Sequence, residues 1–350
     1  MRRIVVAGAG AIGASIAYHL TRREPRDVVL CDLAEVASGS TGKAMGGVRQ
    51  QFSTEAEVRL AQASIRFFAR LGAPLFEQVG YLFLATTEEG LAALDERRIR
   101  QRALGVPVER VDPSVVAGLR VDDVLGATTC REDGVGDPVG VTRHLVAEAV
   151  ARGAGLRERT DAREVDGDVL VVACGPQSAE VAAARDVDLP IRPLCRQLLE
   201  TAAIGALPAR LPMTIEAETG FHFRRRGDRL VVAMVDREPR WGFEEWVDED
   251  VIPDRLARLR HRYPAARETT IERAWAGLYD MTPDAHPIIG WVGDGVYAAC
   301  GFSGHGFMQS PAVGGAAAAE LLGEEPPFDL SPYRLDRFAE GAVFPETLVL

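Results

Sequence analysis

The first 32 residues constrain the fold of this chain more than any other stretch. The apolar run Ile4–Ala7 is followed by G-x-G-x-x-G at residues 8–13, a helix-like segment 14–23, a second apolar run 28–31, and Asp32. This order of strand, glycine turn, helix, strand and carboxylate is typical of a βαβ unit that binds a dinucleotide. The carboxylate of Asp32 is placed to accept a ribose 2′-hydroxyl, which disfavours a 2′-phosphate. The alternative is a glycine-rich structural turn, but the complete pattern favours nucleotide binding.

Each glycine of the pattern has a steric reason. Gly8 permits the tight turn from strand to helix, Gly10 lets the backbone approach a pyrophosphate, and Gly13 lets the helix pack closely on the strand. The first helical turn, with Ala11 and Ile12, presents backbone N–H groups to the phosphates. These residues do not by themselves distinguish NAD from FAD.

Composition excludes several classes of protein. The 350 residues are 47% hydrophobic, so the chain can bury a large core, and we expect two closely joined domains. A net charge of -11 argues against nucleic-acid and anionic-membrane partners, which need basic patches. No apolar stretch reaches the roughly 20 residues of a membrane span. Five cysteines without C-x-x-C spacing predict reduced thiols and a cytoplasmic protein, and six histidines without paired spacing predict no metal site.

Small residues dominate the segment 37–52, which also carries Arg49 and the only lysine of the chain, Lys43. A flexible surface loop is the simplest interpretation. So long a segment without secondary structure in a compact domain favours a functional loop, whose backbone approaches a ligand. The residues that we expect at the cofactor are Ser38, Ser40, Thr41, Lys43, Ala44, Gly46 and Gly47.

The centre of the chain changes character twice. An apolar run at 169–173 leads into Cys174 and Gly175, as a parallel strand does when it ends beside a cofactor, so the nucleotide-binding domain is expected to resume here. From residue 190 short strands are predicted instead, at 197–200, 213–216, 220–223 and 229–234.

Arginines in this second region are predicted to be structural. A helix predicted at 253–263 carries arginines on its solvent face. The run 224–226 precedes Gly227, and we interpret it as a hairpin turn rather than a nucleic-acid patch.

A second glycine-rich turn lies at 301–307, after a strand predicted at 296–300. Ser310 is a favourable N-cap and Pro311 a favourable first helical residue, so we expect a helix to begin there and to run to Leu322. Donors at a helix N-terminus would stabilise negative charge at N1 and C2=O of a reduced flavin. NAD offers no equivalent anion, so this turn favours FAD.

These observations predict an α/β fold with two domains. The first is a Rossmann-like FAD-binding domain that is discontinuous in sequence, and the second is an α+β substrate domain built on a mixed or antiparallel sheet. The predicted boundaries are 1–78, 131–187 and 284–350 for the FAD-binding domain, and 79–130 and 188–283 for the substrate domain.

The chain resembles the FAD-dependent group of D-amino acid oxidase, glycine oxidase and sarcosine oxidase, the DAO family. The resemblance rests on Gly8-x-Gly10-x-x-Gly13 with Asp32, on Ser38-Gly39-Ser40-Thr41 through Gly46-Gly47-Val48-Arg49-Gln50-Gln51, on Met281-Thr282-Pro283-Asp284 with Pro287-Ile288-Ile289-Gly290, and on Gly301-Phe302-Ser303-Gly304-His305-Gly306-Phe307. Many flavoproteins share the first motif, whereas the last is more specific. The chain looks most similar to sarcosine, dimethylglycine and L-proline dehydrogenase-like members.

The resemblance implies oxidation of an amine or an amino or imino acid at its C–N bond. A hydride passes to flavin N5, and the resulting imine hydrolyses in water. The residues implied near the ring are Lys43, Ala44, Gly46, Gly47 and Arg49 on one side, and Gly301, Gly304, His305, Gly306, Phe307 and Met308 at its pyrimidine end. Tyr279 and His222 are implied on the substrate side, so the candidate catalytic residues are Arg49, Tyr279, His305 and His222. For His305 the alternative is a purely geometric role of its backbone, and for His222 a packed histidine.

Three departures from the family pattern refine this prediction. Gly277 stands where monomeric sarcosine oxidases attach flavin through a cysteine, so non-covalent FAD is predicted. Phe52 and Met308 stand where those enzymes bind the substrate carboxylate with basic residues, so Arg49 or an arginine of the central sheet would have to replace them. No lysine besides Lys43 is present to activate oxygen, which favours a dehydrogenase over an oxidase.

Two alternative functions remain open. One is a FAD-dependent 2-hydroxy acid dehydrogenase, because the nucleotide motifs do not distinguish C–N from C–O oxidation. The other is a non-catalytic subunit or assembly factor that carries FAD. The expected partners are the small-molecule substrate and an electron acceptor or partner subunit.

Overall fold

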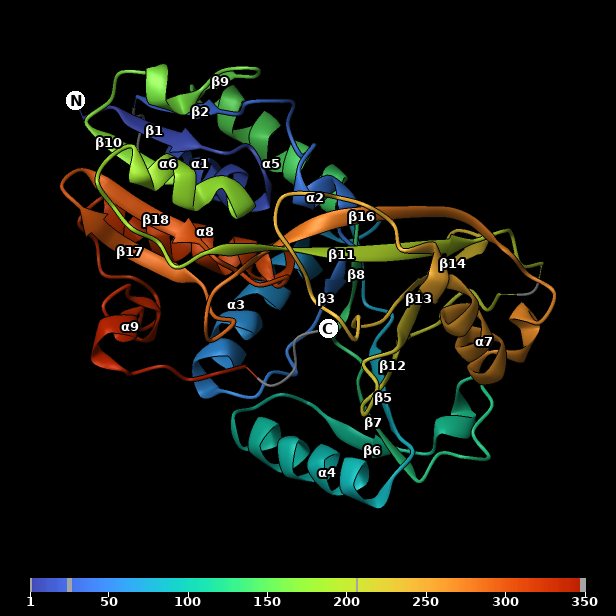
Figure 1. Ribbon diagram of the computed structural model, residues 1–350. Coiled ribbons are helices and arrows are strands. Elements are labelled where there is room, and N and C mark those ends of the chain that lie inside the picture. The colour runs from blue at the N-terminus through green and yellow to red at the C-terminus, as the bar shows by residue number, and fades with distance from the viewer. Residues whose placement is uncertain (1, 24–26, 206, 347–350) are drawn as a thin grey trace.

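The computed structural model describes residues 2–23, 27–205 and 207–346, whose strands form two large sheets and a small one (Figure 1). The first large sheet has the order β17 (Ile288–Gly293), β18 (Val296–Cys300), β10 (Val169–Val172), β1 (Ile4–Ala7), β2 (Val28–Cys31), β9 (Gly155–Arg157). The second has the order β15 (Arg240–Trp241), β11 (Arg192–Thr201), β14 (Arg229–Ala233), β13 (His222–Arg226), β12 (Met213–Glu216), β5 (Tyr81–Ala85), β7 (Gly126–Cys130), β6 (Glu109–Val111), with β16 (Ile271–Met281) also on β11. The small sheet has the order β3 (Gly47–Val48), β8 (Gly134–Gly136), β4 (Phe76–Glu77).

Helices and single turns connect these strands. The α-helices are α1 (Ala11–Arg23), α2 (Ser40–Lys43), α3 (Glu55–Leu71), α4 (Glu88–Ala103), α5 (Pro138–Ala151), α6 (Ser178–Ala183), α7 (Ile252–Arg262), α8 (Gly306–Leu321) and α9 (Arg337–Glu340). The 3-10 turns are η1 (Pro113–Val115), η2 (Ala162–Glu164), η3 (Gly175–Gln177), η4 (Glu249–Val251), η5 (Pro264–Ala266) and η6 (Ser331–Tyr333).

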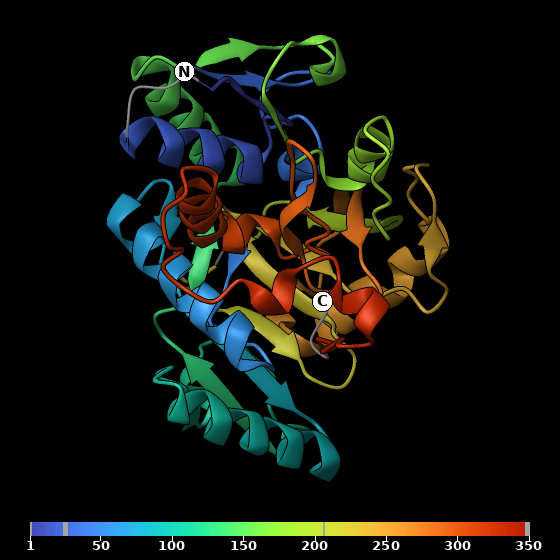
Figure 2. The ribbon, with the colours of Figure 1, turned by 90° about the vertical axis from the view of Figure 1, so that its left-hand side faces the viewer.

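The six-stranded sheet has the parallel core of a Rossmann-like domain. β18, β10, β1, β2 and β9 pair in parallel, and β17 returns antiparallel to β18. Every residue of β1, β2 and β10 is buried because both faces of the sheet are covered. α1, α5 and α8 cover one face, and α6 with η2 covers the other (Figure 2). The predicted fold class is confirmed here.

The nine-stranded sheet is mixed. β5 pairs parallel with β12, and the other neighbours pair antiparallel. Its longest strands, β11 and β16, run side by side from the six-stranded sheet into the second half of the molecule (Figure 1). The pairing from Arg192 with Met281 to Thr201 with Ile271 therefore joins the two halves.

The strands separate by sheet as the predicted domains do. The six-stranded sheet draws only on the segments 1–78, 131–187 and 284–350, and the nine-stranded sheet only on 79–130 and 188–283. This distribution supports the boundaries, which remain a prediction.

The last long helix begins earlier than the sequence predicts. α8 starts at Gly306, so Ser310 and Pro311 lie inside it and the expected cap is wrong. Pro311 has no N–H for the carbonyl of Phe307, and the Ser310 hydroxyl donates to that carbonyl at 2.9 Å instead. The Ser310 hydroxyl thus replaces the missing N–H donor, and the helix can begin upstream of the proline.

Two interpretations of arginines are also corrected. Arg224 and its two successors lie on β13, and the turn follows them at Gly227, which has φ of 62°. On α7, Arg255 and Arg262 are buried rather than solvated, because they pair with Asp236 and with Glu216. In addition, the segment 37–52 is not wholly irregular, since it contains α2 and β3.

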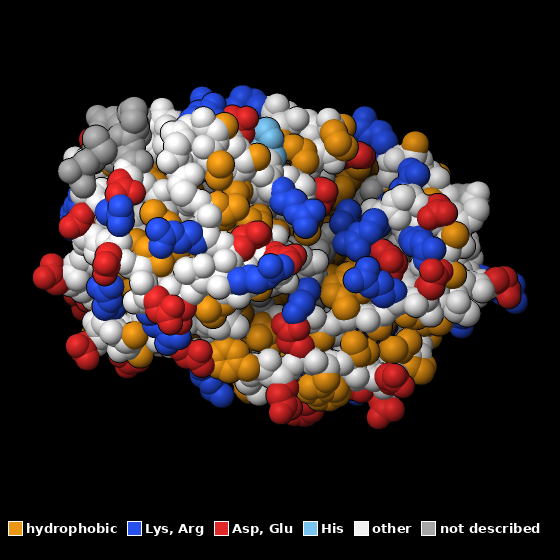
Figure 3. Space-filling view, turned by 90° about the horizontal axis from the view of Figure 1, so that it is seen from above, with side chains coloured by type: hydrophobic (Ala, Val, Ile, Leu, Met, Phe, Trp, Pro, Cys, Tyr) orange, Lys and Arg blue, Asp and Glu red, His pale blue; other side chains and the backbone are white. Residues whose placement is uncertain are grey.

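The surface matches an acidic protein with local basic clusters. Lys and Arg side chains gather near the middle of the face seen in Figure 3, with acidic side chains among them. All five cysteines are free thiols, and Cys174 alone is partly exposed. None of the described helices is long and apolar enough to cross a bilayer. No cluster of three or more metal-binding side chains occurs in the described ranges.

Candidate active site

One long pocket runs from the end of β1 to the face of the nine-stranded sheet. It brings together nearly all predicted site residues. Those that line it are Gly8, Gly10, Ala11, Ile12, Asp32, Ser38, Ser40, Thr41, Lys43, Ala44, Gly46, Gly47, Arg49, Cys174, Gly175, His222, Tyr279, Gly304, His305, Gly306, Phe307 and Met308. Two predicted residues, Gly13 and Gly301, do not line it. A Cβ on Gly13 would collide with the carbonyl oxygen of Gly8, and one on Gly301 would collide with Thr282, so both act through packing.

The first glycine turn forms a cradle for a diphosphate. Gly8 has φ of 100°, and a Cβ there would collide with the carbonyl oxygen of Ala173. A Cβ on Gly10 would meet only the hydroxyl of Thr41, at 3.2 Å, so the backbone stays open toward the pocket. That hydroxyl accepts a hydrogen bond from the backbone N–H of Ala11 at 3.1 Å, which holds α2 over the first turn of α1. The remaining amides at this helix end face the space that phosphates require.

Asp32 lies at the ribose end of the same cradle. Its carboxylate accepts hydrogen bonds from the backbone N–H groups of Ala9 at 2.7 Å and of Ala34 at 2.8 Å, so the backbone fixes its orientation. Each oxygen has a further lone pair for a ribose hydroxyl. The segment 160–163 also lines the pocket, and no site role was predicted for it.

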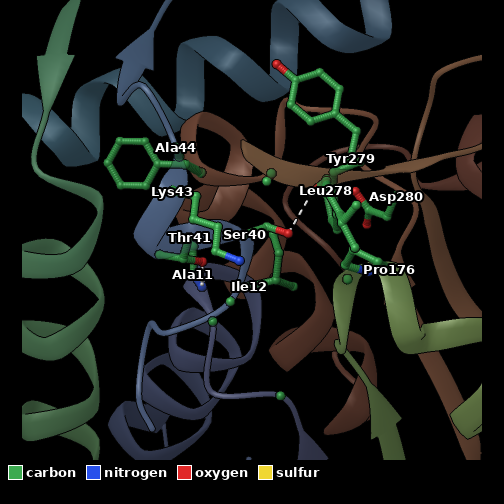
Figure 4. Close-up of a pocket in the computed structure, with 18 of the residues that line it drawn as sticks. Ala11, Ile12, Ser40, Thr41, Lys43, Ala44, Pro176, Leu278, Tyr279 and Asp280 are labelled. Carbon is green, nitrogen blue, oxygen red and sulfur yellow. Dashed lines mark hydrogen bonds between the residues drawn. The ribbon is translucent and has the colours of Figure 1, made fainter. Parts of the chain in front are cut away.

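The loop after β2 is fastened to β16 (Figure 4). The hydroxyl of Ser40 donates to the carbonyl of Leu278 at 2.7 Å, and the indole of Trp275 donates to the carbonyl of Lys43 at 3.0 Å. The amine of Lys43 pairs with Glu245. A Cβ on Gly277 would approach the Cβ of Lys43 to 3.0 Å, so the lysine stem packs against the bare backbone there.

The N-terminus of α8 closes the other end of the pocket. Gly304 has φ of 94°, and a Cβ there would collide with the ring of Tyr279. This close approach brings the first turn of α8 against β16. The buried carboxylate of Asp280 accepts the amide of Gly301 at 2.7 Å and so holds the turn, and burial raises its pKa to about 6.

Arg49 places positive charge at this end, and His305 lies against it. The guanidinium of Arg49 is 1% exposed, lies 4.2 Å from the centroid of the Phe52 ring, and donates to the carbonyl of Gln51. Its other nitrogen lies 3.4 Å from Nε2 of His305, so that imidazole nitrogen is the acceptor. Burial lowers the pKa of Arg49 from its ordinary value, and several acidic neighbours oppose the shift. This contact fixes the orientation of the imidazole, and a catalytic role for His305 stays a prediction.

The wall formed by the nine-stranded sheet carries the remaining polar groups. Nδ1 of His222 lies 2.7 Å from the carbonyl of Gly220 and therefore carries the proton, which leaves Nε2 as an acceptor. Burial lowers the pKa of His222 to about 4, so the imidazole is neutral at pH 7. Burial also raises the pKa of Tyr279, which keeps its hydroxyl protonated. Arg196 of β11 lies on the same wall, with its guanidinium 5.9 Å from the centroid of the Tyr279 ring.

Several lining residues escaped the sequence analysis. They include Tyr81, Asp161, Arg163, Arg196, Leu198 and Met213. Arg196 fell one position before the predicted strand 197–200, whereas β11 begins at Arg192. A predicted strand that began five residues earlier would have included it.

Comparisons with known proteins agree with this geometry. The model of the DAO family, described as FAD dependent oxidoreductase, matches residues 3–320. The chain belongs to this family. Its members take FAD as cofactor, and the diphosphate cradle, Asp32 and the α8 terminus fit that cofactor in this chain. The chain is thus a FAD-dependent oxidoreductase.

Similar proteins differ from this chain in length. Mouse mitochondrial sarcosine dehydrogenase is 25% identical over 382 residues, which cover 96% of this chain and 41% of that protein. The 4-methylaminobutanoate oxidase (formaldehyde-forming) of Paenarthrobacter nicotinovorans is 26% identical, covering 96% of this chain and 46% of that protein. The chain spans less than half the length of these two relatives. The crystal structure of L-proline dehydrogenase from P. horikoshii superposes with a TM-score of 0.91 at 26% identity, over 98% of this chain and 99% of that one.

Proposed function

We propose that the chain oxidises a C–N bond of an amine or an amino or imino acid. The observation that carries the proposal is His222, whose imidazole lines the pocket with Nδ1 engaged by the carbonyl of Gly220 and Nε2 left as an acceptor. Bound FAD supplies the acceptor for the hydride that leaves the carbon next to the nitrogen. The names of the relatives given above describe enzymes that act on nitrogen compounds, which supports the same reaction class.

His222 would hold the substrate nitrogen. The carbon next to the nitrogen can release a hydride only when the nitrogen lone pair is free to form the C=N bond. The amine must therefore be bound unprotonated. Nε2 of His222 would accept a hydrogen bond from the amine N–H. The C–H electron pair then leaves with its proton, the C=N bond forms, and water adds to the product to release a carbonyl compound and the amine.

The positive end of the pocket would stabilise the electrons that leave the substrate. Arg49 is buried and charged, and it orients His305. The backbone amides in the first turn of α8 lie at the same end of the pocket. These groups stand ready before the reaction, so no reorganisation is required when negative charge develops.

Two further features belong to this proposal. FAD is held without a covalent bond, because residue 277 has no side chain and the Cys174 thiol donates to the carbonyl of Ala7. Burial also raises the pKa of Cys174 to about 12, which keeps it unreactive. The electron acceptor is other than oxygen, since the amine of Lys43 is engaged by Glu245.

Product analysis with an artificial electron acceptor tests the proposal. The purified protein is incubated with a panel of primary, secondary and cyclic amines and amino acids, and carbonyl products are quantified. Formation of a carbonyl product from at least one nitrogen compound, reduced about 10-fold or more in H222Q, supports it. Acid precipitation of the same protein should release all flavin to the supernatant. Turnover of hydroxy acids alone, or of nothing while FAD is bound, would refute it.

A further inference from the structure

The segment 341–346, here called the strap, returns from α9 toward the start of α3 (Figure 1). Most of its side chains are in solvent, including those of Val343 and Pro345, and Phe344 is half-buried. Glu346 is different, because only 6% of it is exposed. A carboxylate that is buried on an otherwise exposed segment needs partners to offset its lost hydration.

The turn after β16 fixes the strap in place. The ring of Phe344 stacks on that of His286 with 4.0 Å between the centroids, and Nε2 of His286 donates to the Phe344 carbonyl at 2.6 Å. The backbone N–H of Glu346 donates to the carbonyl of Asp284 at 3.1 Å. Nδ1 of His286 lies 3.1 Å from a carboxylate oxygen of Glu57 on α3. These contacts determine where the Glu346 side chain enters the protein.

The carboxylate of Glu346 is directed at the segment that carries Arg49. It accepts hydrogen bonds from the backbone N–H of Ser53 at 3.1 Å and from the Ser53 hydroxyl. Ser53 follows Phe52, whose ring centroid lies 4.2 Å from the guanidinium of Arg49. Arg49 and His305 line the pocket, whereas Glu346 does not. The carboxylate therefore lies behind the part of the pocket wall that Arg49 forms.

Glu346 and Arg49 act on each other through their charges. Burial raises the pKa of the Glu346 carboxyl, but the guanidinium of Arg49 and the hydrogen bonds from Ser53 outweigh burial, so this pKa lies below its ordinary value. The carboxylate is therefore ionised at pH 7. Burial lowers the pKa of Arg49, and among the described residues Glu346 opposes that shift most. The cation that lines the pocket thus has a counter-charge behind it.

We propose that Glu346 is a positioning residue that holds Arg49 in place, offsets part of its charge, and thereby sets the reduction potential of the bound flavin. Positive charge at this end of the pocket favours the reduced, anionic form of a flavin. A carboxylate behind Arg49 weakens that effect, so the potential is lower than the pocket-lining residues alone would make it. This inference requires FAD binding and does not depend on which hydride donor the pocket accepts.

The alternative is that Glu346 only anchors the strap, as Phe344 does. The two roles predict different changes when the carboxylate is neutralised. Loss of an anchor admits water, which screens Arg49 and leaves the flavin potential unchanged or lower. Loss of the counter-charge raises the potential, because the positive charge of Arg49 is then less compensated. The sign of the change therefore separates them.

The test measures the midpoint potential of the FAD-loaded protein against reference dyes, without substrate. The variants are E346Q, which keeps the size of the side chain, E346D, which keeps its charge, and the matched control E340Q, which neutralises an exposed carboxylate of α9. We expect E346Q to shift the two-electron equilibrium roughly 10-fold toward reduced flavin, or about +30 mV, as for one unit charge at an intermediate dielectric. E346D and E340Q should stay within about 2-fold of the wild type.

Three outcomes would overturn the inference: a potential of E346Q at or below that of the wild type, an equal rise in E346D, or an equal rise in E340Q. If E346Q does not retain FAD, F344A takes its place, because it keeps every charge but removes the ring that stacks on His286. The carboxylate should then move away from Arg49 and the potential should rise, whereas an unchanged potential would also overturn the inference. A raised potential in E346Q, in a protein that oxidises no nitrogen compound, would refute the proposed function alone.

Discussion

The buried carboxylate of Asp280 gives a quantitative prediction. It lies under the turn that precedes α8, and burial raises its pKa from 3.8 to about 6. A difference of roughly two pKa units corresponds to about 3 kcal/mol of differential stability. Because the folded state takes up the proton first, this group stabilises the fold fully below about pH 4, and that stabilisation is lost as the pH rises through 6.

The substitution D280N removes the titration. We expect the free energy of unfolding of the wild type, minus that of D280N, to increase by about 3 kcal/mol between pH 7.5 and pH 4. Urea unfolding of the cofactor-free proteins, followed by tryptophan fluorescence at several pH values, measures this difference. D294N, which changes an exposed carboxylate in the turn after β17, is the control and should give a curve parallel to the wild type. Parallel curves for D280N and the wild type would refute the assignment of this proton.

Three other variants test the frame of the pocket. G10A should weaken FAD binding at least about 10-fold with little change in unfolding temperature, because its methyl enters the diphosphate space and meets only one hydroxyl; unchanged affinity by flavin fluorescence titration would contradict the cradle. G304A should destabilise the protein by roughly 1–3 kcal/mol in urea, since φ is positive and the methyl collides with Tyr279; wild-type stability would be inconsistent with that contact. D284N should lower stability by about 3–5 kcal/mol, because it leaves the buried guanidinium of Arg337 unpaired; a loss below about 1 kcal/mol would show the pair to be dispensable.

Local patterns account for the parts that the sequence predicts well. The G-x-G-x-x-G turn and Asp32 depend on contacts within one βαβ unit, so their spacing alone specifies the cradle. The second glycine turn is similarly local, and its approach to the pocket follows from the positive φ of Gly304. The strands 213–216 and 296–300 have the predicted bounds, since runs of buried side chains mark them.

Tertiary contacts explain what the sequence does not reveal. The start of α8 depends on a side-chain bond from Ser310 to a backbone carbonyl, which local capping rules do not anticipate. β16 mixes Arg273, Gly277 and Asp280 with apolar residues, and only its long pairing with β11 makes it a strand. The position of Arg196 in the pocket follows from the true start of β11, which lies five residues before the predicted strand.

The central claim is that the pocket oxidises a carbon next to nitrogen. The most direct measurement is anaerobic reduction of the bound flavin by matched pairs, each an amino or imino acid and the hydroxy acid with oxygen in place of nitrogen. Loss of flavin absorbance shows that electrons have left the ligand. The account predicts bleaching by at least one nitrogen compound and none by its oxygen counterpart. Bleaching by hydroxy acids alone, or by no member of any pair, would contradict it.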